Sequence, residues 1–520
     1  MNGAQSLVRT LAAGGIEVCF TNPGTSELHV VAALDQLGDI RCVLGLFEGV
    51  VTGAADGYAR MTERPAFTLL HLGPGLANGL ANLHNARRAR VPIVNIVGQH
   101  AIAHQQYDTP LSSNIEAIAL PFSKWLRTSN DTSRLGRDAA EAIVAARAKN
   151  GQIATLIVPA DVAWKEGGAI SETSHSPHPP MPSVDRVEHA AAILRSGRKT
   201  AILIGGKALY GSGLRAAGRI ANATDAKLFA PYPFARIERG PVSPVVERVA
   251  YICEQAVEQF KEFRQLILVG ALAPLPYFAH PTKSIAIAPT ECEIHKLAGP
   301  EEDCIGALES VADSLGLRQG AASPALKVDQ RGPSVGDIAK GEITTRGVAA
   351  AVAALLPENA IVVDESMTSG RELMPATQGS LHHDWLGNTG GSIGIAMPLA
   401  VGAAIACPER RVLCFSADGS GMYTNQALWT MSREGLNITT VIFANRAYAV
   451  LKREFSNFSL GNPGPLACDL FDIGRPDLDW VALAKGMGVP GARVTSLEEF
   501  AKILRKGFET DGPTLIEVPL

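Results

Sequence analysis

The chain has 520 residues, of which 46% are hydrophobic and 19% charged, and its formal net charge is −4. This length is too great for a single hydrophobic core, and the hydrophobic fraction excludes a disordered protein. The charge balance leaves no basic face for nucleic acid. We therefore expect a globular protein of several domains that does not bind nucleic acid.

Two segments rich in proline and polar residues divide the chain. Residues 165–184 and 317–344 have neither a helical nor a strand period and are predicted to be linkers. The parts that they separate, 1–165, 185–316 and 345–520, alternate short apolar runs with helical patterns, as parallel βαβ units do. The sequence therefore predicts an α/β protein with three doubly wound parallel-sheet domains.

The apolar runs place the expected strands. The first part is predicted to hold strands at 18–20, 42–46, 66–71, 93–97 and 155–158; the second at 200–204, 227–230, 266–269 and 284–287; and the third at 360–363, 412–415, 439–443 and 514–518.

In the first part, two residues at predicted strand ends could carry chemistry. Glu48 precedes a helix rich in small residues, where a carboxylate often does no more than complement the helix dipole. His71 ends a strand before a glycine-rich turn, so its imidazole can point to the sheet edge, although a histidine there is often structural. The glycines that follow have the spacing Gly-x-Gly-x-x-x-Gly, and the next strand ends without an acid, which argues against a nicotinamide-binding loop.

In the third part, Asp418 and Asn445 each follow a predicted buried strand. Consecutive parallel strands place such side chains at one carboxyl edge, where open α/β sheets bind ligands. A carboxylate, an amide oxygen and backbone carbonyls suit Mg²⁺, and Gly419 and Ser420 at the head of the next helix can face a phosphate. The pattern predicts a metal–diphosphate clamp, although a strand that ends in Asp-Gly can also be a simple turn.

This stretch resembles the thiamine-diphosphate motif, Gly-Asp-Gly followed by Asn-Asn, and the offset 445 − 418 = 27 lies within the family's range. Ala417 and Ala444 replace the first Gly and the first Asn, neither of which supplies a side-chain ligand. The segments TNPGTSEL and LFEGVVTGAADGYAR resemble those that carry an active-site Ser and an activating Glu in benzoylformate decarboxylase. Over essentially its whole length, the chain resembles the benzoylformate decarboxylase and acetolactate synthase group.

The resemblance implies roles for individual residues. Glu48 would share a proton with the aminopyrimidine ring of thiamine diphosphate, while Thr25 and His71 would stand where the decarboxylase has a Ser and a proton-transferring His. Mg²⁺ would be bound by Asp418, Asn445 and the backbone carbonyl of Ala447. Further cofactor contacts would come from Ser366, Gly391, Ile393, Gly419, Ser420 and Tyr448. The three domains would be the pyrimidine-binding, central and diphosphate-binding domains.

These observations predict a thiamine-diphosphate- and Mg²⁺-dependent decarboxylase that cleaves the C–C bond next to the carbonyl of a 2-oxo acid, with or without carboligation. The alternatives are an acetolactate-synthase-like carboligase, a 2-hydroxyacyl-CoA lyase and a cofactor-binding protein without turnover. His71 favours the decarboxylase. Tyr277, with His280 three residues on, stands in place of its second catalytic His, and a phenol is a poorer proton shuttle near neutral pH.

The resemblance also predicts the oligomeric state and the substrate class of the protein. Its active site would lie between two chains, so a homodimer or homotetramer is expected, with a small 2-oxo acid as substrate. No stretch resembles the FAD-binding middle domain of acetolactate synthases, so FAD is not expected. Scattered cysteines without a Cys-x-x-Cys pair, and a start without a signal-peptide pattern, predict a cytoplasmic protein. Residues 390–407 carry no charge, but their Gly, Ser and Pro content predicts a buried helix rather than a membrane span.

Overall fold

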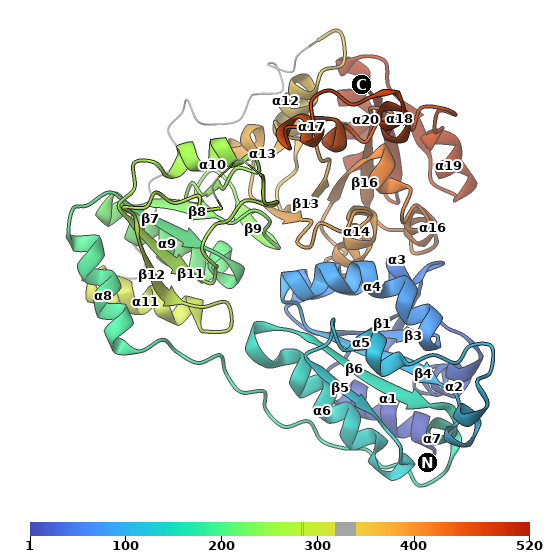
Figure 1. The fold of residues 1–520 in the computed structure, drawn as a ribbon. Coiled ribbons are helices and arrows are strands. Elements are labelled where there is room, and N and C mark those ends of the chain that lie inside the picture. Colours follow the sequence, from blue (N-terminus) through green and yellow to red (C-terminus); the bar gives the residue numbers. More distant parts are fainter. Residues whose placement is uncertain (282, 284, 318–339) are drawn as a thin grey trace.

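The strands form three sheets, each in its own lobe, with the N-terminus in the first lobe and the C-terminus in the third (Figure 1). The computed structural model describes residues 1–281, 283, 285–317 and 340–520. All neighbouring strands run parallel except one pair in the third sheet. The predicted α/β fold with parallel sheets is confirmed.

The first sheet has six strands in the order β2-β1-β3-β4-β6-β5. They are β1 (Val18–Asn22), β2 (Arg41–Leu44), β3 (Ala66–Leu70), β4 (Ile93–Gln99), β5 (Trp125–Thr128) and β6 (Ile153–Pro159). The accompanying helices are α1 (Gly3–Ala13), α2 (Leu28–Leu37), α3 (Glu48–Thr62), α4 (Leu72–Ala89), α5 (Ile115–Ala119), α6 (Leu135–Arg147) and α7 (Ala160–Trp164).

The first sheet is covered on both faces. Phe67 and Leu69 of β3 share a core with α1, α2 and α6, whereas Ala66 and Leu70 share another with α3 and α4. Successive side chains of a strand point to opposite faces, so a strand that is buried on both sides is apolar throughout. This explains why the apolar runs located β3 and β4 so closely. The prediction missed β5, an edge strand whose residues are all partly exposed.

The second sheet has five strands in the order β10-β8-β7-β11-β12. Its elements are α8 (Val184–Arg195), β7 (Thr200–Ile204), α9 (Gly211–Thr224), β8 (Lys227–Ala230), β10 (Glu247–Arg248), α10 (Cys253–Phe260), β11 (Gln265–Val269), β12 (Glu293–Ala298) and α11 (Cys304–Ser314).

The prediction of a strand at 284–287 is wrong for residues 285–287, and Ser284 lies outside the described residues. The edge strand is instead β12, which starts at Glu293. Its first four residues are exposed or partly exposed, so it lacks the apolar pattern by which buried strands are recognised in a sequence. The prediction therefore chose a short apolar run that forms a loop.

The third sheet has seven strands in the order β17-β18-β16-β15-β13-β14-β9. Its strands are β9 (Arg236–Arg239), β13 (Ala360–Glu365), β14 (His383–Gly387), β15 (Val412–Ala417), β16 (Ile438–Ala444), β17 (Gly491–Arg493) and β18 (Thr514–Pro519). Its helices are α12 (Thr345–Leu355), α13 (Leu373–Ala376), α14 (Ala396–Ala406), α15 (Asp418–Gly421), α16 (Ala427–Arg433), α17 (Ala449–Asn457), α18 (Pro465–Phe471), α19 (Trp480–Gly486) and α20 (Leu497–Glu509).

Strand β9 comes from the middle of the chain, pairs antiparallel with β14 and was not predicted. The third sheet thus takes an edge strand from the segment between the two predicted linkers. The first linker, 165–184, has almost no regular structure before α8, whereas most of the second lies outside the described residues. The eight cysteines are free thiols.

The first and third lobes meet where α3 packs on α14 (Figure 1). A Cβ added to Gly57 would lie 2.1 Å from the carbonyl oxygen of Leu399, and one added to Gly402 would lie 1.9 Å from that of Ala54. Only glycine allows the two backbones to approach so closely. Helix α14 is buried almost throughout, which accounts for its lack of charge. Among the described residues, no helix combines the length and the apolar character needed to cross a membrane.

A buried ion pair near the end of α3 connects all three parts of the chain. The guanidinium of Arg60 donates to both carboxylate oxygens of Asp56, at 2.7 Å each. Its remaining N–H groups donate to the carbonyl oxygens of Ala235 at 3.0 Å and Gly387 at 2.6 Å, and to the hydroxyl of Thr389 at 3.2 Å. One side chain thus fixes α3 against the segments that lead into β9 and out of β14.

We expect Arg60→Met to destabilise the protein by about 3–5 kcal/mol, because the Asp56 carboxylate would stay buried without its counter-charge. Equilibrium urea unfolding measures this loss. The matched control is Arg64→Met, which breaks the exposed pair with Glu17 and should cost less than about 1 kcal/mol. Equal losses in the two variants would contradict the role assigned to Arg60.

Candidate active site

Glu48 and His71 lie at the carboxyl edge of the first sheet. Glu48 follows β2 and begins α3, and His71 stands between β3 and α4. Glu48 is 8% exposed, and its Oε2 accepts a hydrogen bond from Asn78 Nδ2 at 3.0 Å. A Cβ added to Gly75 would lie 3.3 Å from His71 Cβ and 3.4 Å from Glu48 Oε1. The structure therefore brings the two predicted residues together across Gly75.

His71 has a buried carboxylate partner that the sequence did not reveal. Glu27 is 1% exposed, and its Oε2 lies 2.7 Å from His71 Nδ1. The hydroxyl of Ser26 lies 2.7 Å from Glu27 Oε1 and 3.2 Å from His71 Nδ1. A carboxylate at this distance favours the tautomer with the proton on Nδ1, which leaves Nε2 as the nitrogen that can exchange a proton with a ligand.

The neighbouring Thr25 was predicted to supply a hydroxyl to the site. Its side chain is exposed, and Ser26 is the hydroxyl residue that contacts His71. Ser26 and Glu27 lie in the same segment as Thr25, TNPGTSEL. The presence of an acid in this segment, near the sheet edge where His71 was expected, could have indicated Glu27. A Cβ on Gly98, at the end of β4, would lie 1.6 Å from Glu27 Oε1. A glycine at this point makes room for the acid.

The third sheet places Asp418 and Asn445 at its carboxyl edge, at the ends of β15 and β16, which pair in parallel. Asp418 is 2% exposed and accepts from the backbone N–H groups of Gly419 at 2.8 Å and Arg446 at 2.6 Å. Burial raises the pKa of Asp418, against the opposing effect of these N–H groups. The side-chain amide oxygen of Asn445, Oδ1, accepts a hydrogen bond from the backbone N–H of Ala447 at 3.1 Å. The chain turn after β16 thus keeps the three predicted metal ligands within one loop cluster.

Of the residues predicted to meet the diphosphate, Gly419, Ser420 and Tyr448 lie close to Asp418, whereas Ser366 bonds Asp364. Helix α15 has only four residues, so Gly419 and Ser420 sit in a short turn rather than at the head of a long helix. A Cβ on Gly419 would lie 2.7 Å from the ring of Tyr448. Ser366 is buried, and its hydroxyl donates to Asp364 Oδ1.

Ser369, which was not among the predicted contacts, bonds Asn445 in the loop after β16, whereas Ser366 does not. Its Oγ accepts from Asn445 Nδ2 at 3.4 Å. The loop after β13 is therefore joined to the loop after β16, as two segments around a common ligand would be. In this loop, Ser366 faces away from Asn445 toward Asp364 and Gly370, since a Cβ on Gly370 would lie 1.6 Å from its hydroxyl.

Gly391 and Ile393 lie in the loop between β14 and α14. Gly391 has φ +78, and its N–H donates to Asn388 Oδ1 at 2.8 Å. Helix α4 of the first lobe holds this loop from one side: Asn85 bonds both the N–H and the carbonyl of Ser392, at 3.3 and 2.9 Å. Because α4 also carries Asn78, which bonds Glu48, one helix contacts both Glu48 and the Gly391 loop of the same chain.

A second buried acid, Glu365, holds the same loop and was missed by sequence reasoning. It ends β13, is 2% exposed, and accepts from Asn388 and from the backbone N–H groups at the start of α14. Burial raises its pKa to about 7, although these donors favour the ionised form. The sequence contains an acid pair at 364–365, and nothing in the pattern indicates which of the two turns inward.

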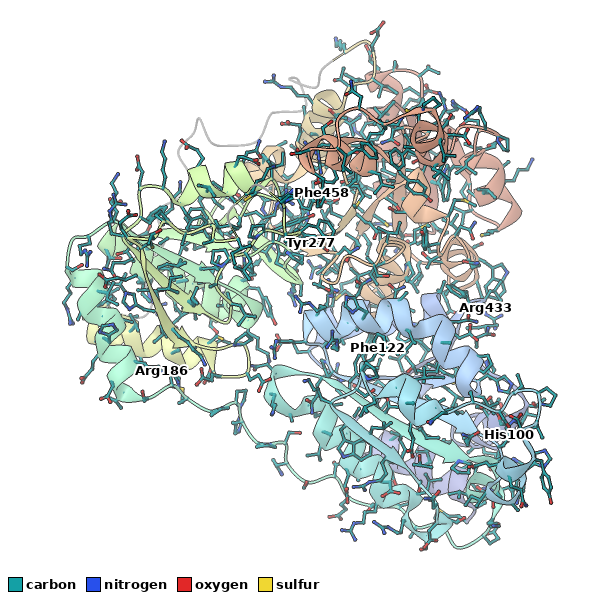
Figure 2. All side chains as sticks on the ribbon, viewed as in Figure 1. His100, Phe122, Arg186, Tyr277, Arg433 and Phe458 are labelled. Carbon is teal, nitrogen blue, oxygen red and sulfur yellow. The ribbon has the colours of Figure 1, made fainter. Side chains whose placement is uncertain are left out.

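Tyr277, rather than His280, reaches the Gly391 loop. A Cβ on Gly391 would lie 2.0 Å from the Tyr277 hydroxyl. The ring of His280 instead lies 4.5 Å from that of Phe458, and its Nδ1 is buried without a hydrogen-bond partner among the described residues. Tyr277 and Phe458 lie at the boundary between the second and third lobes (Figure 2).

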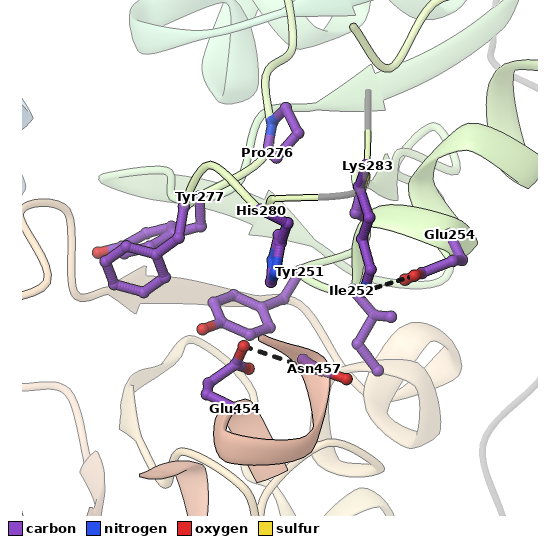
Figure 3. Close-up of a pocket in the computed structure, with 11 residues that line it drawn as sticks. Tyr251, Ile252, Glu254, Pro276, Tyr277, His280, Lys283, Glu454 and Asn457 are labelled. Carbon is purple, nitrogen blue, oxygen red and sulfur yellow. Dashed lines mark hydrogen bonds and ion pairs between the residues drawn. The ribbon is translucent and has the colours of Figure 1, made fainter. Parts of the chain in front are cut away.

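A small pocket lies at this boundary (Figure 3). Its lining is aromatic and polar: Tyr251, Tyr277, Phe278, His280, Glu254, Lys283, Glu454 and Asn457 are among the residues that form it. Glu254 pairs with Lys283 at 2.6 Å, and Asn457 donates to Glu454 at 3.2 Å. The pocket is therefore next to the Gly391 loop through Tyr277, and its walls carry charge of both signs.

Models of a known family match both ends of the chain. The N-terminal TPP binding domain of thiamine pyrophosphate enzymes matches residues 1–120, and the C-terminal TPP binding domain matches residues 371–518. A Mycobacterium tuberculosis protein with the provisional name acetolactate synthase large subunit IlvX is 50% identical over 525 residues, which cover 100% of this chain and 99% of that protein. Benzoylformate decarboxylase of Pseudomonas aeruginosa is 28% identical over 544 residues, with 97% and 96% of the two chains covered.

Solved structures share the fold over the whole chain. The thiamine diphosphate-dependent 4-hydroxybenzoylformate decarboxylase of Rhodococcus jostii superposes with a TM-score of 0.87 at 23% identity, with 100% of this chain and 99% of that chain covered. Benzoylformate decarboxylase of Polynucleobacter necessarius gives a TM-score of 0.84 at 20% identity, with the same coverage. At these identities the likeness concerns the fold alone.

We expect the buried Glu365 to make stability depend on pH. Its pKa in the folded protein, about 7, exceeds the value of 4.5 for an unperturbed Glu, so its contribution to stability is present below about pH 4.5 and is lost as the pH rises through 7. Between about pH 5 and about pH 8, wild type should lose about 2–3 kcal/mol more unfolding free energy than Glu365→Gln. Urea unfolding at both pH values measures the difference, and parallel pH curves would contradict it.

Proposed function

Because this chain belongs to the family of thiamine pyrophosphate enzymes, we propose that it is a thiamine-diphosphate- and Mg²⁺-dependent lyase that decarboxylates a 2-oxo acid. Thiamine pyrophosphate and thiamine diphosphate are the same compound. The observation that carries the proposal is the pair of His71 and buried Glu27 beside Glu48. A proton-transferring imidazole next to the acid that serves the cofactor suits a reaction in which a proton replaces CO₂.

The residues at the third sheet fit a bound cation. Asp418 is buried, and among the described residues no Lys or Arg forms an ion pair with it. A buried carboxylate without a counter-charge is costly, and a divalent cation would remove this cost. Within the described ranges no three His, Cys, Asp or Glu side chains cluster around a metal-sized space, so Mg²⁺ would be bound by Asp418, the Asn445 amide oxygen, the Ala447 carbonyl, and oxygens of diphosphate and water.

When bound, the cofactor supplies a nucleophilic carbon and accepts the electrons released from the bond to the carboxylate. Side chains of the protein carry out the proton transfers. Glu48, held by Asn78, is placed to share a proton with the aminopyrimidine ring. Glu27 holds His71 through Nδ1 and would stabilise its protonated ring, which could give the proton on Nε2 to the substrate carbon in place of CO₂. Gly391 and Ile393 would hold the pyrimidine side of the cofactor.

A second candidate is an acetolactate-synthase-like carboligase, which the 50% identity to the Mycobacterium tuberculosis protein of that provisional name supports. The same residues would serve this reaction, except that a second 2-oxo acid takes the place of the proton as the electrophile. His71 favours protonation, because an imidazole beside the reacting carbon competes with ligation. The two reactions differ in product and can be separated by it. Activity on a 2-hydroxyacyl-CoA would favour a lyase of that class.

We also propose that the enzyme is a cytoplasmic homodimer or homotetramer with active sites between chains. Within one chain, Glu48 and Asp418 have separate hydrogen-bond partners, Asn78 for the first and two backbone N–H groups for the second. Pairing Glu48 of one chain with Asp418 of another would give a complete cofactor site. Analytical ultracentrifugation tests this assembly, and a strictly monomeric active enzyme would overturn it.

A panel of 2-oxo acids with thiamine diphosphate and Mg²⁺ tests the proposed function, with CO₂ and the organic product followed by mass spectrometry. We expect CO₂ with an aldehyde from at least one acid, and loss of activity on chelation of Mg²⁺ that added Mg²⁺ restores. Acetolactate formed from pyruvate would favour the carboligase. Cofactor binding without CO₂ release from any acid would leave a protein that binds the cofactor but has no turnover.

We expect His71→Ala to lower the rate of aldehyde release by about 10²–10⁴, because the proton donor is lost. Glu27→Gln should give a smaller loss and shift the pH–rate profile, since the amide cannot stabilise the protonated imidazole. His189→Ala, at an exposed position on helix α8 of the second lobe, serves as the control and should change little. A normal rate in His71→Ala would remove the histidine from the reaction.

A further inference from the structure

The loop that carries Gly391 and Ile393 has one carboxylate beneath it. The N–H of Gly394 donates to both oxygens of Glu365 at 3.1 Å, that of Ile395 to Oε1 at 3.4 Å and that of Ala396 to Oε2 at 3.3 Å. Bonds from these three N–H donors would be expected of any acid that caps a helix, since the first N–H groups of α14 have no partner within the helix. By themselves they indicate only a structural role.

A fourth donor, the side chain of Asn388, goes beyond a helix cap. Asn388 Nδ2 donates to Glu365 Oε1 at 3.0 Å, and the Oδ1 of the same amide accepts from the backbone N–H of Gly391 at 2.8 Å. Asn388 Nδ2 also donates to the carbonyl oxygen of Ser392 at 2.9 Å. Because the acid orients the amide, and the amide bonds the residues on both sides of the turn, the carboxylate acts on Gly391 through Asn388.

The geometry of the loop requires such support. Gly391 and Gly394 both have positive φ, +78 and +91, so the segment between them follows no regular structure that would hold it in place. Within the described part of the chain, its polar contacts are with Asn85 of α4, with Thr424, whose hydroxyl donates to the carbonyl oxygen of Gly394 at 2.6 Å, and with Glu365 and Asn388. Among the described residues, Glu365 forms no ion pair, so the charge that these N–H groups see is not shared with a cation.

We propose that Glu365 is a positioning residue for thiamine diphosphate. It holds Asn388 and the start of α14 so that the carbonyl of Gly391 and the side chain of Ile393 keep the places that the cofactor needs. This inference rests on the proposed function, because it assumes that the loop meets the cofactor. It predicts that replacing the charge will weaken cofactor binding more than it weakens the fold.

The experiment compares Glu365→Gln, which keeps the size and removes the charge, with Glu517→Gln as a matched control. Glu517 is also a buried acid, and its strand β18 lies in the same sheet but away from the loop. Isothermal titration calorimetry with thiamine diphosphate and Mg²⁺ gives the affinity, and hydrogen exchange of the cofactor-free protein reports on the amides of residues 388–396. Thermal melting separates effects on the whole fold.

We expect Glu365→Gln to weaken cofactor binding about tenfold or more and to speed exchange at Gly391, Gly394 and Ile395, whereas Glu517→Gln changes neither. Asn388→Ala leaves the buried acid in place and should weaken binding similarly, which keeps the test decisive if Glu365→Gln does not fold. A cofactor affinity within about twofold of wild type in both variants would overturn the inference. Equal losses of affinity in Glu365→Gln and Glu517→Gln would also overturn it, in favour of a purely structural acid.

The same titration separates the two proposals. If the wild-type protein does not bind thiamine diphosphate at all, the proposed function fails before any variant is compared. If wild type binds and the loop variants bind equally well, the function stands and Glu365 loses its assigned role.

Discussion

Within one chain, the buried guanidinium of Arg60 fixes the helix that carries Glu48 relative to the loop that carries Gly391. Helix α3 begins with the predicted catalytic acid Glu48 and carries Arg60 one turn after Asp56, its carboxylate partner. From there Arg60 bonds the carbonyl of Gly387 and the hydroxyl of Thr389, the residues that lead directly into the Gly391 loop. A shift of α3 would therefore move both the acid and the loop. Because the ion pair is buried, removing either charge leaves the other buried without a counter-charge, which costs free energy. The arrangement is therefore energetically costly to disrupt.

Three other buried acids belong to the predicted site or contact it. Glu27 orients the ring of His71, Glu365 supports the Gly391 loop through Asn388, and Asp418 is held by backbone N–H groups at the end of β15. All three lie at or just beyond the carboxyl ends of parallel strands, where side chains from different strands converge. In a site of low dielectric constant such hydrogen bonds are strong, but an unpaired charge is costly. Asp418 is the acid for which we propose a cation as counter-charge, because it lies beside Asn445 and Ala447.

Buried strands could be predicted from the sequence because each is a continuous apolar run, which can be recognised without knowing the neighbouring strands of the sheet. Strands β3, β7, β15 and β16 lie within a residue or two of their predicted bounds. The strands that were missed or misplaced lie at or next to sheet edges: β5, β9, β10, β12, β14 and β17. An edge strand needs apolar residues on one side only, and β9 finds its partner about 145 residues away, at 383–387, so no local pattern marks it.

The sequence by itself determined the fold class, the parallel sheets, and the presence of Glu48, His71, Asp418 and Asn445 at strand ends, since these depend on local periodicity and on motif spacing. Only the tertiary structure decided which acids support them. Neighbouring residues of a strand point to opposite faces, so whether Asp364 or Glu365 is buried depends on the register of β13 in its sheet. Likewise, Glu27 and His71 are 44 residues apart in the chain and meet only because β1 and β3 are paired.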